Sequence, residues 1–341
     1  MMKRLFLIFA VCALCAACGD DDPTAPDAGV LPIVRSDLLF DPQGRTGSIE
    51  VAASGDVTAE LPSTWCSASV QGRVVSVTVA DNTSFEGRTA VLTLRADGRQ
   101  VQVPVQQRGM ALGSLSLASD HIGTAGGRLS YFIRHDLPIA LTTDDGWIHP
   151  RMEGDSLVVD CDASDTWHLR RGTLRYECAG YGGQLTITQY DLDTILGEYI
   201  FGGSMGSASA GFHFNLVRSG GNYYMVFFTV ADWASSLVPV DFDERRCELT
   251  FHSATTIYEN NSSSYVYYFF SDKGVANTPT ATMKAALYYN PVMGTHYAPL
   301  EDTGSWENGP LTGFLLRMNG LVPANIIQLN DRYIQKVLDS E

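Results

Sequence analysis

Hydrophobic and polar residues alternate along several short segments of the chain. Every second residue is valine over residues 75–79 and again over 101–105, and Leu157, Val159 and Cys161 follow the same period. A period of two places successive side chains on opposite faces of a strand. Gly, Asn and Asp interrupt the pattern at turn-like intervals, and no helical period is visible. The pattern therefore predicts an all-β fold.

These strands belong to an internal repeat. The stretch 65–107 returns as 147–189 without a gap, at a constant offset of 82 residues. Identical pairs include Gly44/Gly126, Trp65/Trp147, Gly72/Gly154, Arg88/Arg170, Gly98/Gly180 and Gln107/Gln189. A register held this long indicates two tandem copies of one domain. We predict domains at residues 31–109 and 113–191, each built as a β-sandwich around an inward-facing Trp65 or Trp147.

The repeated residues form a spaced motif. In the first copy Trp65 opens a strand, an alternating strand leads into Asn82, Arg88 ends a loop, and Gln107-Arg108-Gly109 closes the domain. The second copy keeps Trp147, Arg170 and Gln189, with Ser164 for the Asn and Asp191 for the Gly. This motif resembles the BACON domain, the Bacteroidetes-associated carbohydrate-binding often N-terminal module. The resemblance implies immunoglobulin-like sandwiches that bind glycan or act as spacers.

The segment 192–341 differs in composition. It contains 23 Phe, Trp or Tyr residues, against 12 in the preceding 191 residues. Turns rich in Gly, Ser and Asn separate strand candidates at 198–201, 211–217, 223–230, 248–252, 264–270, 283–289 and 314–318. Such a meander predicts an antiparallel β-barrel or sandwich domain. Its Gly197-x-Tyr199 opening is loosely similar to that of lipocalins, and residues 326–338 fit either a last strand or a short helix.

The chain begins like a bacterial lipoprotein. A positive start precedes a 13-residue apolar run, which is short for a membrane span. Cys15-Ala16-Ala17-Cys18 then resembles a lipobox in which Cys15 replaces the usual leucine. We predict a signal peptide at 1–17, lipidation of Cys18 and an acidic, Pro-rich tether over 18–30.

The acidic run Asp20-Asp21-Asp22 after Cys18 has two interpretations. It resembles the surface-export signal of Bacteroidetes lipoproteins, which implies an outer-membrane lipoprotein exposed on the cell surface. The alternative is a solvated charge run without a transport role.

Charge and ligand spacing narrow the classes of partner. The formal net charge of −15 disfavours binding to nucleic acid and electrostatic binding to anionic lipid. The seven histidines have no metal-ligand spacing, and the N-terminal Cys-x-x-Cys-x-x-Cys lies in the signal peptide. We predict no metal, no cofactor, and membrane contact through the lipid anchor only.

Two segments resemble active-site or calcium-binding motifs. Residues 202–206 match Gly-x-Ser-x-Gly, but a nucleophile elbow needs a following helix, and the flanks here favour a hairpin loop. Asp241-Phe242-Asp243-Glu244 lacks the loop of a calcium site and is more typical of a solvated acidic turn. We therefore expect a protein without catalytic activity.

Four aromatic residues are candidate platforms for sugar stacking. Phe85 and Trp167 occupy the same loop position in the two repeats, and Trp233 and Trp306 lie in turn-rich stretches of the last segment. An exposed ring can stack on the C–H face of a sugar. The alternative for each is a ring folded back onto the core.

Two further features concern covalent chemistry. Cys161 and Cys178 both fall on inward positions, which makes them a candidate disulfide. The equivalent residues of the first copy are Val79 and Ala96, so the fold does not need a bridge. Thr194 lies in Asp193-Thr194-Ile195, which resembles the O-glycosylation motif of exported Bacteroidetes proteins.

The sequence favours a cell-surface lipoprotein that binds a polysaccharide or a glycoprotein glycan through its aromatic-rich last domain, with the two sandwiches as spacers or additional binding modules. The alternative is an adhesin, or an accessory subunit of a surface complex, that binds protein. An exposed rank of rings would favour the glycan ligand, and a broad apolar patch would favour the protein ligand.

Overall fold

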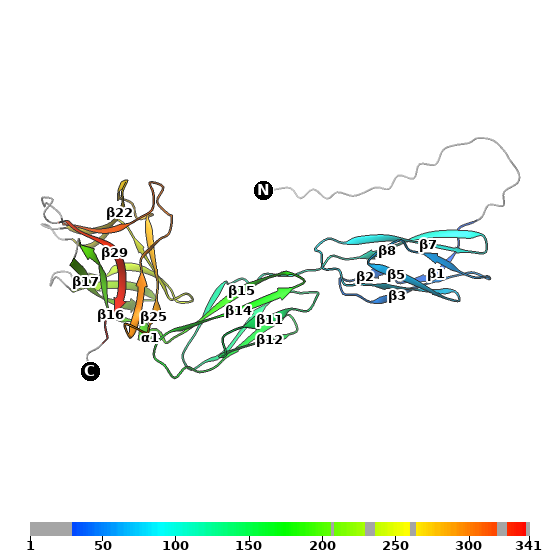
Figure 1. The fold of residues 1–341 in the computed structure, drawn as a ribbon, viewed down its shortest axis with the longest axis horizontal. Coiled ribbons are helices and arrows are strands. Elements are labelled where there is room, and N and C mark those ends of the chain that lie inside the picture. Colours follow the sequence, from blue (N-terminus) through cyan, green and yellow to red (C-terminus); the bar gives the residue numbers. More distant parts are fainter. Residues whose placement is uncertain (1–28, 206–207, 229–235, 260–263, 319–325, 339–341) are drawn as a thin grey trace. The chain divides into compact units, whose positions relative to one another are not determined.

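The computed structural model describes residues 29–205, 208–228, 236–259, 264–318 and 326–338. These residues are almost entirely in strands, and the one α-helix among them is the single turn α1 (Leu192–Ile195). The chain divides into two compact units, with the boundary after Met110 (Figure 1). The predicted all-β fold class is confirmed. Among the described residues, no helix is long and apolar enough to span a bilayer.

The first unit is a sandwich of two sheets. One sheet has the order β1-β3-β6-β5 and the other the order β2-β8-β7-β4. The strands are β1 (Ile33–Ser36), β2 (Leu39–Phe40), β3 (Thr46–Val51), β4 (Thr58–Glu60), β5 (Cys66–Gln71), β6 (Val74–Val79), β7 (Arg88–Ala96) and β8 (Arg99–Gln107). The alternation in β6 buries Val75 and Val77 against Leu92 and Leu94 of the facing sheet. The apolar period thus builds an immunoglobulin-like core.

The second repeat folds with the same strand order, except that its described residues include no counterpart of β1. Its sheets have the orders β10-β13-β12 and β11-β14-β15-β9. The strands are β9 (Ser119–Ile122), β10 (Gly127–Phe132), β11 (Ala140–Thr143), β12 (Ile148–Glu153), β13 (Ser156–Cys161), β14 (Arg170–Cys178) and β15 (Tyr181–Gln189). Strands β13, β14 and β15 lie 82 residues after β6, β7 and β8 at both ends. The constant sequence offset therefore corresponds to equivalent strands.

The repeated Trp, Arg and Gln form one network in each sandwich. Gln107 is buried; its amide accepts a hydrogen bond from Arg88 Nε at 2.9 Å and donates to the carbonyls of Pro42 and Ala80, both at 3.0 Å. The Arg88 guanidinium lies over the Trp65 ring, 4.5 Å from its centroid. Trp65 is half-buried beneath this arginine and packs against the edge of the core.

The second sandwich contains the same network. Gln189 is fully buried, accepts from Arg170 Nε at 2.7 Å, and donates to the Gly123 and Asp162 carbonyls at 3.0 and 2.9 Å. Arg170 covers Trp147 at 4.4 Å. The motif shared by the copies therefore ties separate loops together at one end of each sandwich.

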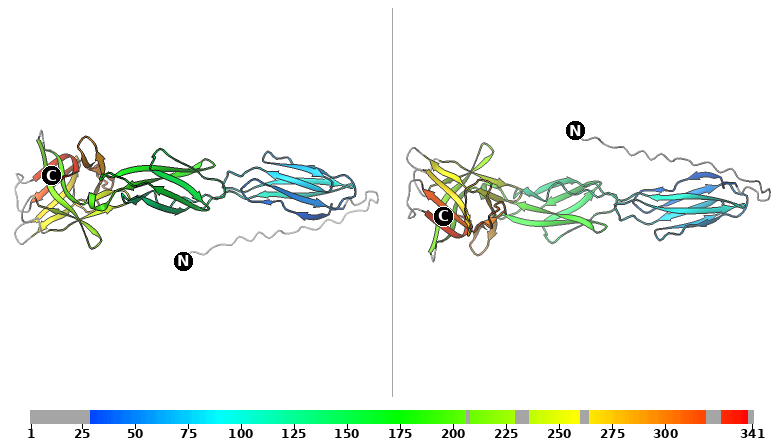
Figure 2. Two further views of the ribbon diagram at one scale, coloured as in Figure 1. Left: turned by 90° about the horizontal axis from the view of Figure 1, so that it is seen from below. Right: turned by 90° about the horizontal axis from the view of Figure 1, so that it is seen from above.

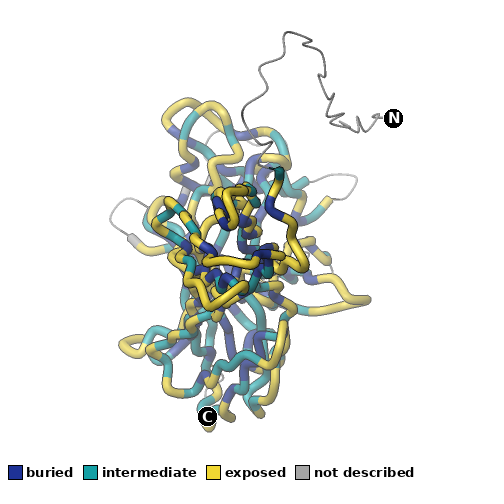
Figure 3. Tube along the Cα trace, turned by 90° about the vertical axis from the view of Figure 1, so that its right-hand side faces the viewer, coloured by how far each residue is buried: buried dark blue, intermediate teal, exposed yellow. Residues whose placement is uncertain are grey.

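The segment 197–336 forms one antiparallel sheet of 14 strands, curled around its own core (Figures 1 and 2). The main path is β21-β22-β28-β29-β16-β17-β18-β19-β20-β24-β27, with β23, β25 and β26 attached at its sides. The strands are β16 (Gly197–Met205), β17 (Ala208–Ser219), β18 (Asn222–Phe227), β19 (Val238–Asp243), β20 (Glu248–His252), β21 (Thr255–Glu259), β22 (Ser264–Ser271), β23 (Gly274–Ala276), β24 (Thr282–Ala286), β25 (Tyr288–Asn290), β26 (Thr295–Pro299), β27 (Glu301–Asp302), β28 (Gly313–Met318) and β29 (Ile326–Lys336). Most of the largest fully buried side chains of the described residues belong to this sheet. Buried residues alternate with half-buried or exposed ones along strands such as β18, β20 and β24, and Figure 3 colours the trace by burial.

Three local expectations for this segment are now resolved. Residues 326–336 are a strand, so the helix alternative is wrong. Residues 202–205 continue β16 and pair with β17, whereas we predicted a hairpin loop there. Asp241 to Asp243 lie in β19 instead of a turn, because Asp241 pairs across the sheet with Thr250. In the last two cases cross-strand pairing extends a strand into residues that look turn-like along the sequence.

Candidate functional site

The four predicted stacking residues have different environments. Phe85 is 50% exposed on its loop. Trp167 is 43% exposed, but its ring meets Tyr289 and His296 edge-on, with centroids 5.6 and 5.2 Å apart. Trp306 is half-buried and packs against the core of the last segment, which is the alternative of a ring folded back onto the core. Trp233 lies outside the described residues. Phe85 belongs to the first unit, and Trp167 and Trp306 belong to the second.

A different set of rings does lie together on the outer face of the last sheet. We call Tyr288, Tyr297 and Tyr333 the tyrosine face. Tyr297 and Tyr333 have centroids 5.3 Å apart and planes inclined by 29°. Tyr288 lies opposite Tyr297 at 5.8 Å, with its plane turned by 73°. Tyr297 and Tyr333 are therefore stacked with an offset, and the 40% exposed Tyr288 meets Tyr297 edge-on.

The position of the Tyr333 ring in the tyrosine face depends on a glycine. Gly202 of β16 pairs with Tyr333 of β29, and a Cβ at Gly202 would come within 2.5 Å of Tyr333 Cζ. The Tyr333 ring therefore lies across the backbone of the neighbouring strand. This arrangement, in which an aromatic ring covers a glycine on the next strand, is a known stabilising device of sheets. It holds the ring in place.

Polar groups continue the tyrosine face across the sheet. Gln335 lies opposite Tyr297 on one side and opposite Ile200 on the other, and His213 lies opposite Ile200. The His213 ring meets Phe228, which is 38% exposed, at 5.8 Å. With strands about 4.8 Å apart, this row of outward side chains spans roughly 24 Å. The row offers rings at both ends and hydrogen-bonding groups between them.

The hydroxyl of Tyr297 is held in its protonated form. Burial and the neighbouring Tyr288 and Tyr333 hydroxyls raise the pKa of Tyr297 above its ordinary value. At neutral pH it can both donate and accept hydrogen bonds. Farther along, His213 Nδ1 lies 2.6 Å from Glu198 Oε1, which orients the imidazole. The surface is suited to a ligand with apolar faces and many hydroxyl groups.

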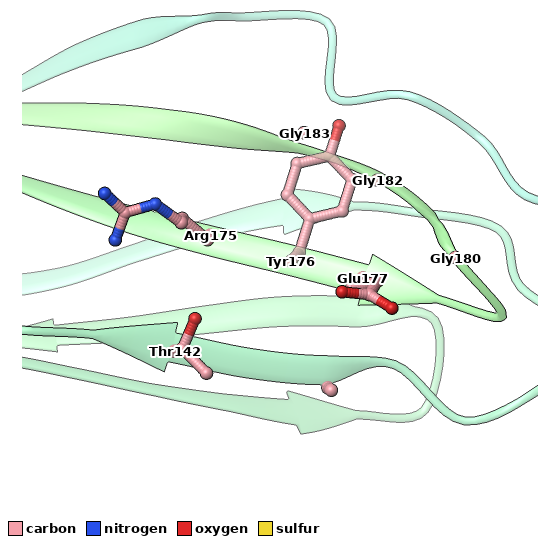
Figure 4. A pocket seen from close by; sticks show the side chains of 8 residues that line it. Thr142, Arg175, Tyr176, Glu177, Gly180, Gly182 and Gly183 are labelled. Atoms are coloured by element: carbon pink, nitrogen blue, oxygen red, sulfur yellow. The ribbon is translucent and has the colours of Figure 1, made fainter.

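A hollow of about 290 Å³ lies on the second sandwich (Figure 4). Arg175, Tyr176 and Glu177 of β14 line it beside Gly182 and Gly183 of β15. An equivalent hollow lies on the first sandwich, beside Arg95 and Gln100. At the matching positions Glu177 replaces Arg95 and Gly182 replaces Gln100. Because its polar lining differs between the copies, this hollow follows from the hairpin geometry and does not indicate one ligand.

The other predicted site residues do not form a reactive centre. Cys161 and Cys178 are free and buried, so the candidate disulfide is not formed. They end strands β13 and β14, which belong to different sheets, and the Cys178 thiol contacts the Leu137 carbonyl at 3.5 Å. Thr194 is half-buried in α1, where its hydroxyl donates to the Asp191 carbonyl. Cys18 lies outside the described residues.

The acidic segment of β19 is already paired. Asp241 binds His252 Nε2 at 2.7 Å, and Asp243 accepts from the backbone N–H of Arg245 at 2.9 Å. Glu244 accepts a hydrogen bond from the Tyr223 hydroxyl. Within the described ranges, no group of three or more His, Cys, Asp or Glu side chains is arranged to hold a metal ion.

Sequence reasoning missed the tyrosine face. Its signal was the turn at 290–294, because a hairpin centred there places Tyr288 opposite Tyr297. The predicted strand 283–289 includes Tyr288, but no predicted strand includes Tyr297. Nothing in the sequence near Tyr333 indicates that it lies beside these residues, because β29 pairs with β26 from a distant part of the chain.

Comparison with known proteins finds a family match within the first unit. Residues 54–108 match the BACON family, described as "Putative binding domain, N-terminal". The matched family is the one that the motif of the first repeat resembles. No curated protein is similar enough to the chain to count as a relative.

Solved structures similar to the chain include several titin fragments. A tandem fragment from titin is 8% identical and covers 88% of this chain and 98% of its own length, with a TM-score of 0.34. An I-band fragment is 10% identical and covers 80% and 92%, with a TM-score of 0.25. A pair of tandem Ig domains is 12% identical and covers 47% and 96%, with a TM-score of 0.23.

Proposed function

We propose that this protein is a surface lipoprotein that binds a glycan, without turnover, on the tyrosine face of its last domain. The observation that supports this most directly is the nearly parallel pair Tyr297 and Tyr333 with Tyr288 at its edge. Sugar rings present C–H groups on their faces and hydroxyls on their edges. The stacked pair, with Tyr288 at its edge and with Gln335 and His213 farther across the sheet, complements both features.

The ligand that fits this surface is an extended, uncharged chain. The face is an open strip of outward side chains that crosses several strands, which suits a polysaccharide lying flat. The stacked pair and the edge-on Tyr288 place aromatic surface at one end of this strip.

The glycan prediction is tested with full-length protein on a glycan array, followed by calorimetry on any hit. Replacing Tyr297 or Tyr333 with alanine is expected to weaken binding at least tenfold, which corresponds to about 1.4 kcal/mol. Tyr268→Ala is the matched control, because Tyr268 is a half-buried tyrosine of the same sheet on β22, away from the tyrosine face. Equal losses in all three variants would contradict the assignment.

An apolar hairpin tip favours the second candidate, a protein ligand. Val292 is 95% exposed and Met293 is 49% exposed at the turn between β25 and β26. Exposed apolar side chains of this kind occur at protein interfaces. A blank array, together with a protein captured on cells by cross-linking and lost in Val292→Asp, would favour the adhesin or accessory-subunit function over glycan binding.

The lipid anchor is a separate part of the proposal and rests on the sequence around Cys18. We expect Cys18→Ala to move the protein from the membrane fraction to the soluble fraction, because several acyl chains are needed for stable attachment. Labelled fatty acid should enter the parent and not the variant. Cys66→Ala controls for loss of a thiol elsewhere. Equal labelling of Cys18→Ala and the parent would exclude Cys18 as the anchor site.

A further inference from the structure

The second sandwich and the last sheet share an aromatic cluster. The loop 167–169 of the sandwich contributes Trp167 and His168, and the hairpin of β25 and β26 contributes Tyr289 and His296. The His168 and Tyr289 rings are stacked, with centroids 3.9 Å apart and planes inclined by 9°. Trp167 meets both hairpin rings edge-on. Four rings from two sheets therefore pack as one group.

Hydrogen bonds and apolar burial extend this contact. The backbone N–H of Leu169 donates to His296 Nε2 at 3.1 Å. The Tyr190 hydroxyl donates to the Glu244 carbonyl, and the Arg171 guanidinium donates to the Arg246 carbonyl, both at 2.6 Å. Leu169 and Tyr190 are buried within the hydrophobic core of the last segment. The sandwich thus supplies part of that core.

The sequence repeat shows that this contact surface is specific to the second copy. At the offset of 82 residues, Trp167, His168, Leu169, Arg171 and Tyr190 correspond to Phe85, Glu86, Gly87, Thr89 and Arg108. None of these five pairs is identical, whereas the neighbouring Arg170 and Gln189 are unchanged. The residues that build the sandwich are kept, and those that contact the last sheet are changed to larger or more apolar ones.

The hairpin of β25 and β26 carries the tyrosine face on its other side. Tyr289 lies opposite His296, and both face the aromatic cluster. The adjacent pair, Tyr288 and Tyr297, points to the opposite side because side chains alternate along a strand. One short hairpin therefore contacts the second sandwich with one face and presents two of the three tyrosines with the other.

We propose that Trp167 and His168 are positioning residues for the tyrosine face, so that residues 111–341 form the binding unit. This is an additional role for the second sandwich, and it rests on the proposed function only for the identity of the ligand. Among the described strands β25 pairs with β26 alone, so few backbone hydrogen bonds fix it in the sheet. The ring contacts of Trp167 and His168 with Tyr289 hold this strand in place.

The test uses hydrogen exchange on the full chain. Trp167→Ala and His168→Ala should each raise the exchange of amides in the β25–β26 hairpin by about tenfold or more relative to the parent. The matched controls are Phe85→Ala and Glu86→Ala, which alter the equivalent loop of the first sandwich and should leave the hairpin unchanged. If the parent binds a glycan, both test variants should bind it severalfold more weakly, although the three tyrosines are intact.

The two proposals fail in different ways. Hairpin exchange that is the same in parent and test variants would overturn the positioning role, whatever the glycan result. An equal rise in hairpin amide exchange in Phe85→Ala would also overturn the positioning role, because the effect would then not depend on Trp167 and His168. A parent that binds no glycan, with a hairpin loosened only in Trp167→Ala and His168→Ala, would reject the glycan ligand and support the positioning role.

Discussion

Gln107→Leu should lower the unfolding free energy of the first sandwich by about 3 kcal/mol. The substitution keeps the approximate volume of a buried side chain and removes its hydrogen bonds to Arg88 and to the Pro42 and Ala80 carbonyls. Leaving such groups unpaired in a buried site costs about 1–3 kcal/mol for each group. The measurement is chemical denaturation of the full chain, following the transition of the first unit.

A matched control is built into the repeat. Gln102 and Gln184 also recur at the offset of 82 residues, but both are exposed on β8 and β15. Gln102→Leu should change stability by less than about 0.5 kcal/mol, and Gln189→Leu should reproduce the large effect in the second unit. If Gln102→Leu and Gln107→Leu were equally destabilising, the network would not be the reason for the repeated glutamine.

The repeat and the strands could be predicted because their causes are local. Alternation around Val77 reports a strand with one buried face, and the fixed offset reports a shared topology. The environment of Trp65 was only partly predicted. Its ring lies at the edge of the core beneath Arg88, since a guanidinium that is hydrogen-bonded to Gln107 can cover an aromatic face at little cost.

The candidate site could not be read in the same way. The tyrosine face joins residues from β25, β26 and β29, and its members become neighbours only through the sheet order. Trp167 was identified as a loop ring from its equivalence to Phe85, but the residues it packs against lie more than 100 positions later. Periodicity shows which face a side chain takes and does not show which strand lies next to it.

Acidification is expected to destabilise the second unit through His296. Burial, with Lys336, His168 and Arg171 nearby, lowers the pKa of His296 from its ordinary value to about 4. Because Nε2 accepts the Leu169 N–H, the proton of the neutral ring sits on Nδ1, a buried atom without a hydrogen-bond partner among the described residues. A second proton would occupy Nε2, break that bond, and place a charge beside two cations.

The sign and the pH window follow from this lowered pKa. His296 takes up the proton near pH 6.5 in the unfolded chain and only near pH 4 in the folded chain. The contribution of His296 to the free energy of unfolding is therefore complete above pH 6.5 and is lost as the pH falls to about 4. One pKa unit corresponds to about 1.4 kcal/mol, which gives a loss of roughly 3 kcal/mol. His252, whose pKa is raised through its hydrogen bond to Asp241, contributes to the pH dependence of stability with the opposite sign.

The test therefore compares the pH dependence of unfolding between variants. His296→Gln keeps an acceptor for the Leu169 N–H and should flatten the pH dependence between pH 4 and 6.5. His149→Gln, at an exposed histidine of the same unit, should not flatten it. Parallel pH profiles for the parent and His296→Gln would exclude His296 as the group responsible.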